Sequence, residues 1–374
     1  MQILHISNDF SLTKVHSNLY KALDKQNIDQ IVFNPVRDAT PVGNNTVSFE
    51  STKSAIIYSK KLKKYHRFLF RQKINFLYQD LHSKIDLNKI DICHATTLFS
   101  DGALAYKIKK KHGIPYICAV RATDIDVFLK YRPDLLFIAL KILRSAEKII
   151  FIGDSLKKRF FEHTLIKKYK LKLKSNSKVI YNGVDDFWLN NICPKKNIKP
   201  HRILYVGRFI SRKSIPNLIE AILYLKNKDY NLELNLVGSG GTDEPIIKDF
   251  VKKNKGIINL LGQIKDKETL KQIYRENHIF AMPSKGETFG LVYIESLSQG
   301  LPVLYLRDEG IDGVFKYKIG EKCNVHSIKE ITDSLVNLID NYSKYDIDKI
   351  DFEQFRWRNI AARYLTIYKS ICKH

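Results

Sequence analysis

The chain has 374 residues, enough for two domains of ordinary size, and its 44% hydrophobic and 27% charged residues are those of a soluble globular protein. No uninterrupted apolar run approaches the roughly 18–20 residues of a membrane-spanning helix, so we expect no such helix. The net charge of +24 is uneven, because residues 1–202 contain 37 Lys and Arg against 17 Asp and Glu, whereas residues 203–355 contain 21 against 22.

Short apolar segments alternate with helical patterns in the N-terminal half. The first segment, Ile3 to Ile6, is predicted to be a strand and not part of a signal peptide. Further strands are predicted at 31–33, 90–95, 115–120, 148–152 and 178–181, with a helix at 101–111. This alternation predicts a buried parallel sheet of βαβ units.

A second series of strands follows residues 194–202, a basic segment bounded by prolines that we expect to be a linker. The strands of this series are predicted at 203–206, 232–237, 257–261, 279–282 and 302–305. We therefore expect an α/β protein with two doubly wound, Rossmann-like domains that face each other across a cleft. Their predicted limits are 1–193 and 203–350, and a last helical segment, 351–374, is expected to cross back to the first domain.

The cysteines are scattered along the chain and odd in number. They are Cys93, Cys118, Cys193, Cys323 and Cys372, and no two of them form a C-x-x-C pair. A disulfide framework or a zinc site is therefore not expected, and a reducing cytoplasm is the compartment that fits best.

Two carboxylates stand eight residues apart across a predicted junction of loop and helix. Glu287 lies in the loop, and Glu295 lies in the helix that follows Gly290. A carboxylate accepts hydrogen bonds from two neighbouring hydroxyls, as in a sugar or a ribose. The start of a helix has free backbone N–H groups that can bind a diphosphate, here those of Phe289, Gly290, Leu291 and Val292. The alternative is that both glutamates simply face solvent in an ordinary βα unit, because this spacing is also common there.

Two cations follow the first strand of the second series. Arg208 and Lys213 come after residues 203–206, and ligands bind at the carboxyl ends of strands in open parallel sheets. Both side chains can therefore meet a diphosphate. The alternative is a pair of solvated loop cations.

Together these segments resemble glycosyltransferases. Gly286-Glu287-Thr288-Phe289-Gly290, then Glu295 and Gly300-x-Pro302-Val303, resembles the E-x7-E signature of family 4 retaining glycosyltransferases, which have the GT-B fold. The resemblance implies that Glu287 is the catalytic residue at the transferred sugar and that Glu295 binds the donor ribose. Arg208 and Lys213 match the segment that binds the donor diphosphate in that family. Gln263 and Ile264 match the loop near the nucleotide base.

The resemblance also bears on metals. Fixed cations and helix-start N–H groups can stabilise a departing nucleoside diphosphate in place of a divalent ion. The only Asp-x-Asp pair, Asp124 and Asp126, lies in the other domain, where the matching family segment is not a metal site. We therefore expect no metal and no cofactor, with a nucleotide-sugar donor, UDP- or GDP-linked, as substrate.

The N-terminal domain departs from the family pattern. Its first loop lacks the Gly-Gly pair found there, so contacts from this loop must come from Ser11, Thr13 or Lys14. Arg121 replaces a histidine that lies near the transferred sugar in the family, and an arginine cannot act as a base. It either binds a charged group of the donor or acceptor or pairs with Asp124.

His94 matches another histidine of the family, at the end of an earlier strand. A buried histidine with a structural role explains this position equally well.

Basic residues alternate with apolar ones at 53–73, and a second basic cluster lies at 157–174. Each cation near an anionic leaflet contributes about 1 kcal/mol, so these segments predict a membrane-docking face. The alternative is a lysine-rich, solvated surface.

The predicted function is that of a retaining hexosyltransferase in surface polysaccharide assembly, such as O-antigen, capsule or exopolysaccharide, which uses a lipid-linked glycan acceptor. Its expected location is cytoplasmic and peripheral, on the inner face of the membrane. Front-face attack and a covalent intermediate are both compatible with these residues.

One alternative is a GT-B enzyme with a soluble acceptor. The other is a non-catalytic nucleic-acid-binding protein, suggested only by a pI of about 9.6. Since no nucleic-acid-binding signature is present, we expect no nucleic-acid partner.

Overall fold

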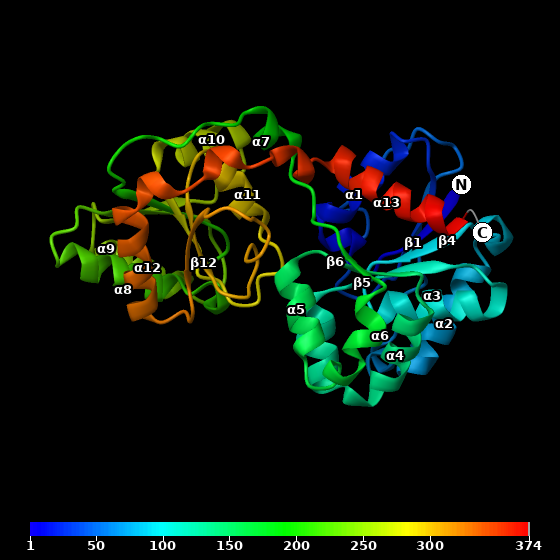
Figure 1. Ribbon diagram of the computed structural model, residues 1–374. Coiled ribbons are helices and arrows are strands. Elements are labelled where there is room, and N and C mark those ends of the chain that lie inside the picture. Colours follow the sequence, from blue (N-terminus) through cyan, green and yellow to red (C-terminus); the bar gives the residue numbers. More distant parts are fainter. Residues whose placement is uncertain (373–374) are drawn as a thin grey trace. The chain divides into compact units, whose positions relative to one another are not determined.

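A computed structural model describes residues 1–372, which form two compact units (Figure 1). Unit 1 comprises Met1–Ile152, Leu156–Gly183 and the described part of Trp357–His374. Unit 2 comprises Gly153–Ser155 and Val184–Arg356. Residues 373–374 of the predicted last segment lie outside the described residues. No helix among those described is long and apolar enough to cross a membrane.

Unit 1 is built on a parallel sheet of seven strands in the order β3-β2-β1-β4-β5-β6-β7. The strands are β1 (Gln2–Ile6), β2 (Asp29–Asn34), β3 (Ala55–Tyr58), β4 (Ile92–Ala95), β5 (Tyr116–Val120), β6 (Lys148–Phe151) and β7 (Ser177–Val179). Its helices are α1 (Lys14–Asp24), α2 (Phe70–His82), α3 (Ser100–His112), α4 (Leu136–Ser145), α6 (Lys170–Lys174) and α13 (Trp357–Cys372). Helix α5 (Asp154–Glu162) belongs to this unit from Leu156 onward.

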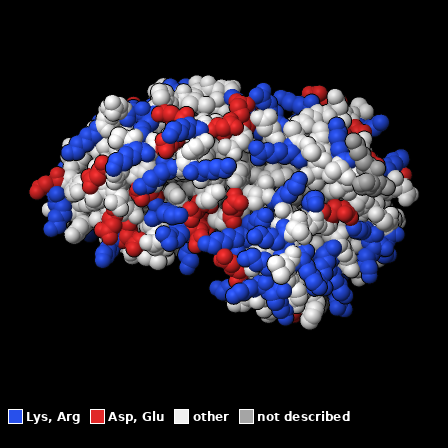
Figure 2. All heavy atoms as spheres, viewed as in Figure 1, with Lys and Arg blue, Asp and Glu red and all other residues white. Residues whose placement is uncertain are grey.

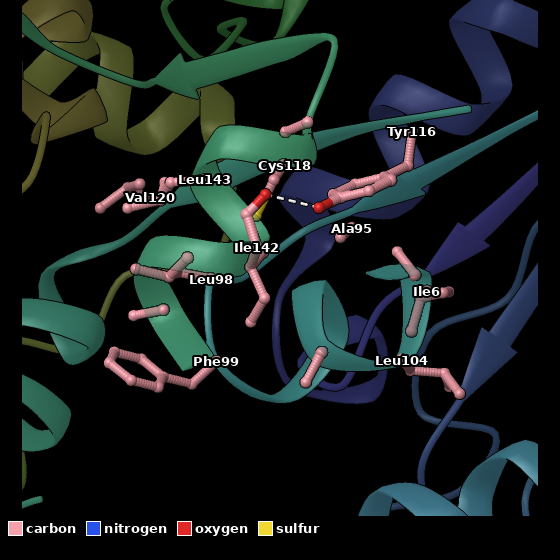
Figure 3. Packing of buried hydrophobic residues seen from close by; sticks show 14 of the residues in the cluster. Ile6, Ala95, Leu98, Phe99, Leu104, Tyr116, Cys118, Val120, Ile142 and Leu143 are labelled. Atoms are coloured by element: carbon pink, nitrogen blue, oxygen red, sulfur yellow. Dashed lines mark hydrogen bonds between the residues drawn. The ribbon is translucent and has the colours of Figure 1, made fainter. Parts of the chain in front are cut away.

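Both faces of this sheet are buried, because successive side chains of each strand point to opposite sides. Leu4 and Cys118 enter a core formed with α2, α3, α4 and α5, whereas Ile3 and Ile117 enter a core formed with α1 and α13. Figure 3 shows the first core, where the Tyr116 hydroxyl donates a hydrogen bond of 2.5 Å to the carbonyl of Ile142. The sheet is therefore the middle layer of three.

Unit 2 repeats this plan with six parallel strands in the order β10-β9-β8-β11-β12-β13. The strands are β8 (Arg202–Val206), β9 (Glu233–Val237), β10 (Ile258–Gly262), β11 (Ile279–Ala281), β12 (Val303–Leu306) and β13 (Gly320–Cys323). The helices are α7 (Asp186–Asn190), α8 (Ile215–Lys226), α9 (Glu244–Lys253), α10 (Lys267–Glu276), α11 (Leu291–Ser298) and α12 (Ile328–Asp340). The prediction of two doubly wound parallel sheets is thus confirmed.

Two strands, β3 and β13, were not predicted. Both lie at the edge of their sheet, and edge strands are short and tolerate polar residues. β13 contains Glu321 and Lys322, which hide the strand pattern. β3 lies in a segment that was assigned to membrane docking because of the lysines around it.

That assignment of residues 53–73 is wrong for most of its apolar side chains. Ile56 packs on one core of unit 1 and Ile57 on the other. Leu62 and Phe70 are buried, as is Lys73, whose ammonium lies 2.6 Å from the Ser100 hydroxyl. The apolar spacing of this segment therefore reflects a strand and a helix that pack on the sheet.

The segment expected to be a linker is held within unit 2. The Cys193 amide donates to the carbonyl of Ser298, and the Lys195 ammonium contacts three backbone carbonyls, those of Tyr342, Ser343 and Tyr345, at 2.7–3.1 Å. Residues 184–193, expected in the first domain, also belong to unit 2. The last helix begins at Trp357, later than the expected 351, and lies in unit 1 against the β-sheet face that α1 covers.

Candidate active site

The candidate site of unit 2 lies at the carboxyl ends of its central strands. β8 and β11 are neighbours in the sheet, although two other strands separate them in sequence. The strand order reverses at this point, which is where open α/β sheets bind their ligands. The loops that follow β8 and β11 contain Arg208, Lys213 and Glu287.

The structure joins two of these residues in an ion pair. The Lys213 ammonium lies 2.5 Å from a carboxylate oxygen of Glu287, and both side chains are largely buried, with 11% and 13% exposed. Lys213 also approaches the sulfur of Met282 at 3.4 Å. The sequence assigned Lys213 to the diphosphate and Glu287 to the sugar, whereas the structure brings the two charges into contact.

Glycine fixes the junction between Glu287 and helix α11. Gly290 has a φ of 73°, which favours glycine, and a Cβ there would lie 2.6 Å from the Tyr293 ring and 3.1 Å from the Glu287 side chain. The Gly310 amide donates to the Glu287 carbonyl at 2.8 Å. Glu287 is therefore held beside the start of α11, where the first-turn N–H groups have no acceptor within the helix.

Glu295 lies in α11 and is partly buried. The Tyr274 hydroxyl is 3.4 Å from its carboxylate. The pKa of Glu295 is raised to about 7, chiefly by burial; the Tyr274 hydrogen bond lowers it, the nearby Asp185 raises it and Lys267 lowers it. Asp185 and Lys267 form an ion pair of 2.5 Å, which sequence analysis missed because α7 and α10 are far apart in the chain.

The remaining residues that the sequence predicts to bind the donor lie at or near the surface of unit 2. Arg208 is exposed, and the adjacent Arg212 donates to the Gly286 carbonyl at 3.2 Å, linking the loops after β8 and β11. Gln263 is exposed after β10, and its side-chain oxygen accepts from Ser239 at 3.4 Å, while Ile264 is partly buried. Arg212 was not predicted, although it stands between the two cations that were.

In unit 1, the side chain of Arg121, which was expected to bind a substrate charge or to pair with Asp124, contacts backbone. The Arg121 guanidinium donates to the Thr96 carbonyl at 3.0 Å, and only its backbone N–H donates to Asp124, at 2.8 Å. The buried Asp124 carboxylate also accepts from the amides of Leu98 and Phe99 just before α3. Asp124 therefore orders backbone, including the Arg121 amide, while the Arg121 side chain bonds to the Thr96 carbonyl and its charge acts on Asp124 without a direct side-chain contact.

The first loop of unit 1 uses its polar side chains for local structure. The buried Ser11 hydroxyl donates to Asn34 at 2.6 Å, and the Thr13 hydroxyl accepts from the Val15 amide at the start of α1. These contacts occupy two of the three side chains expected to meet a ligand. Lys14 is exposed.

His94 is buried in the sheet of unit 1. Its Nδ1 lies 2.8 Å from the Tyr368 hydroxyl of α13, and burial lowers its pKa well below the usual value. The ring is therefore neutral and packed, as in the structural alternative.

Asp101 is a buried acid that sequence analysis passed over as an ordinary helix start. It accepts from the hydroxyls of Thr96 and Thr97 at 2.9 and 3.0 Å. Burial and the nearby Asp9 raise its pKa to about 7. In the sequence, only the two threonines before the helix indicated that this acid has local hydrogen-bond donors.

The Asp-x-Asp segment is not arranged as a metal site. Asp126 forms an ion pair of 2.6 Å with Arg159, while Asp124 accepts from backbone. Among residues 1–372, no group of three His, Cys, Asp or Glu side chains is placed to hold a metal ion.

Comparison with known proteins identifies the family and the fold. The family described as Glycosyltransferase Family 4 matches residues 14–186, and the family described as Glycosyl transferases group 1 matches residues 190–347. The chain belongs to the family 4 glycosyltransferases. This glycosyltransferase has the GT-B fold, as the resemblance implied.

Three similar proteins illustrate the relationship. The capsular polysaccharide biosynthesis glycosyltransferase CapM of Staphylococcus aureus is 26% identical over 68% of this chain and 70% of its own. The alpha-monoglucosyldiacylglycerol synthase of Acholeplasma laidlawii is 25% identical over 60% of each. The structure of Anabaena HepE in complex with UDP superposes with a TM-score of 0.65 at 15% identity, covering 100% of this chain and 99% of that one.

The raised pKa of Glu295 predicts a pH-dependent stability of the glycosyltransferase. Because the folded-state pKa lies above the unfolded one, the native protein binds the proton more readily and loses stability as pH rises from about 4.5 to about 7. Glu295→Gln should therefore stabilise the protein by about 1–3 kcal/mol at pH 8 and hardly at all at pH 5. Urea unfolding at both pH values measures this, and an equal effect at both would contradict it.

Proposed function

We propose that this glycosyltransferase transfers a hexose, with retention, from a UDP- or GDP-linked donor bound by unit 2 to a lipid-linked glycan. The observation that carries the proposal is the Lys213–Glu287 ion pair beside the start of α11. It places a cation, a carboxylate and free helix N–H groups together, which are the groups that a diphosphate-linked sugar needs.

The donor diphosphate is bound by positive charge from two loops. The Lys213 ammonium exchanges part of its contact with Glu287 for a phosphate oxygen, and exposed Arg208 reaches the other phosphate. The N–H groups of the first turn of α11, those of Leu291 and Val292, donate to the same anion. These donors are most effective as the bond to the sugar breaks, since the leaving diphosphate gains negative charge.

Glu287 acts at the sugar. Its carboxylate accepts hydrogen bonds from sugar hydroxyls and stabilises the positive charge of an oxocarbenium-like transition state. Gly290 and Gly310 hold it there, because a side chain at either position would press on Glu287.

Glu295 binds the ribose of the donor. An ionised carboxylate accepts from both ribose hydroxyls, and the Tyr274 hydroxyl orients it. Burial makes the free carboxylate costly, and two ribose hydroxyls offset that cost. Gln263 and Ile264 follow β10, two strands from β8 in the same sheet, and face the base of the nucleotide in this proposal.

The acceptor is proposed to be a lipid-linked glycan at the inner face of the membrane. Support comes from the relatives, since one is named for capsular polysaccharide biosynthesis and another for a glycolipid. The charge distribution supports it too, because the residues of unit 1 carry most of the excess Lys and Arg. Exposed Lys14 and the Arg121 guanidinium are proposed to meet the charged part of the acceptor or donor, and an enzyme with a soluble acceptor is the alternative.

Glu287→Gln should slow transfer by at least about 100-fold, because it removes a charge that stabilises the transition state. Nucleoside diphosphate should bind as well as to wild type or more tightly, since Lys213 loses its counter-charge. Single-turnover transfer and calorimetric titration separate the two effects. The exposed Glu220→Gln of α8 is the matched control. Lost nucleotide affinity with intact transfer would contradict the assignment.

Transfer is proposed to need no metal ion, because Lys213, Arg208 and the α11 amides neutralise the leaving group. Excess EDTA should leave the rate within about twofold of the untreated enzyme. A rate that EDTA abolishes and magnesium or manganese restores would refute this.

A further inference from the structure

An open groove of about 950 Å³ lies within unit 1, and neither the donor site nor the sequence motifs account for it. It runs over α2, α3 and α4, the adjacent helices that cover one face of the sheet. Its volume is at the upper end of the roughly 300–1,000 Å³ of small-molecule pockets. It contains no residue of unit 2.

The groove has an apolar floor that extends onto the surface. Ile74 and Leu135 are buried at its base, whereas Phe68 and Phe137 are 73% and 77% exposed and Leu69 is 46% exposed. Two aromatic side chains this exposed in one groove are unusual for a surface in water. The groove therefore offers a site for apolar groups.

Cations surround this floor. They are Arg71, Lys107, Lys110, Lys111, Arg132 and Lys141. The only acid in the lining is Asp134, which already holds Arg132 through two hydrogen bonds of 2.8 and 2.7 Å. Within residues 1–372, none of the four lysines forms an ion pair with a carboxylate. Burial and the neighbouring Lys111 lower the pKa of Lys107, as expected where cations crowd without counter-charge.

Apolar groups beside unpaired cations match the chemistry of an acidic phospholipid. Its phosphate pairs with lysines at the interface, and its acyl chains accept aromatic side chains. Figure 2 shows how densely Lys and Arg cover the part of unit 1 around α4, α5 and α6. Positive charge is thus widespread on this unit, and what distinguishes the groove from the rest of the basic surface is its exposed aromatic side chains.

We propose that the α2–α3–α4 groove is where the enzyme enters an anionic bilayer, with Phe68 and Phe137 in the apolar boundary and Lys107, Lys110 and Lys141 on lipid phosphates. The groove keeps the end of the predicted segment 53–73, where Phe68 and Arg71 lie, and adds side chains of α3 and α4 in place of the predicted cluster 157–174. The proposal deepens the lipid-linked function given above and rests on it.

Vesicle binding tests the groove directly. The full-length enzyme is sedimented with vesicles of phosphatidylcholine alone or mixed with phosphatidylglycerol. Wild type should bind the anionic vesicles only, and Phe68→Ser/Phe137→Ser should weaken this binding at least tenfold. Lys107→Gln/Lys110→Gln/Lys141→Gln should weaken it to a similar extent. The phenylalanine variant should keep the wild-type urea midpoint, because Phe68 and Phe137 are exposed. Lys107 is partly buried and its ammonium donates to the Asn75 side chain, so the urea midpoint of the lysine variant is measured beside its vesicle binding.

Matched controls separate the groove from the general charge of unit 1. Lys167→Gln/Lys168→Gln/Lys172→Gln removes the same charge from exposed lysines outside the groove, and Leu171→Ser removes an apolar side chain that is 89% exposed. Both controls should bind like wild type. Equal loss in the controls, or unchanged binding by the Phe68 and Phe137 variant, would overturn the proposal. So would a wild-type dimer in light scattering that this variant dissociates, since a second copy would then cover the groove.

Failure of the groove and failure of the proposed function are distinguishable. If the phenylalanine variant binds vesicles like wild type while Glu287→Gln abolishes transfer, only the groove is wrong. If vesicle binding follows the groove while Glu287→Gln transfers normally, the groove stands and the catalytic assignment fails.

Discussion

The contact between Lys213 and Glu287 is the constraint on which the candidate site depends. It joins the loops after β8 and β11, and it keeps two opposite charges largely out of water. A pair of this kind is costly to break by removing one partner, because the other charge is then left buried and unpaired. In the proposed function, the donor diphosphate takes over the contact of Lys213 and the sugar that of Glu287, so donor binding would exchange one set of charge contacts for another.

The surrounding backbone is shaped to keep this pair in place. Gly290 adopts a left-handed conformation directly before α11, and its missing side chain leaves room for the Glu287 side chain. Arg212 and the Glu287 carbonyl tie the same loop to its neighbours. Unit 1 uses its polar residues differently, since Asp124, Ser11 and Thr13 satisfy backbone or side-chain groups of their own fold.

The sequence predicted what depends on local pattern. Central strands such as β1 and β8 are mainly apolar runs that are followed by turn residues, so they were found within one or two residues, whereas the polar edge strand β13 was not. Glu287, Glu295 and Lys213 were found from motif spacing, but their spacing could not show that Lys213 touches Glu287, because strand order decides that contact. The groove was foreseen only in part, since Phe68 lies in the predicted docking segment 53–73, whereas Phe137 joins it only through the packing of α2, α3 and α4.

The most direct test of the account is the affinity of Lys213→Ala for nucleoside diphosphate, measured by titration calorimetry with UDP and with GDP. The account predicts that the variant loses at least tenfold in affinity for whichever nucleotide the wild type binds, about 1.4 kcal/mol or more. The exposed Lys228→Ala, in the turn just after α8, should bind like wild type. An unchanged dissociation constant for Lys213→Ala would contradict the claim that the ends of β8 and β11 form the donor site.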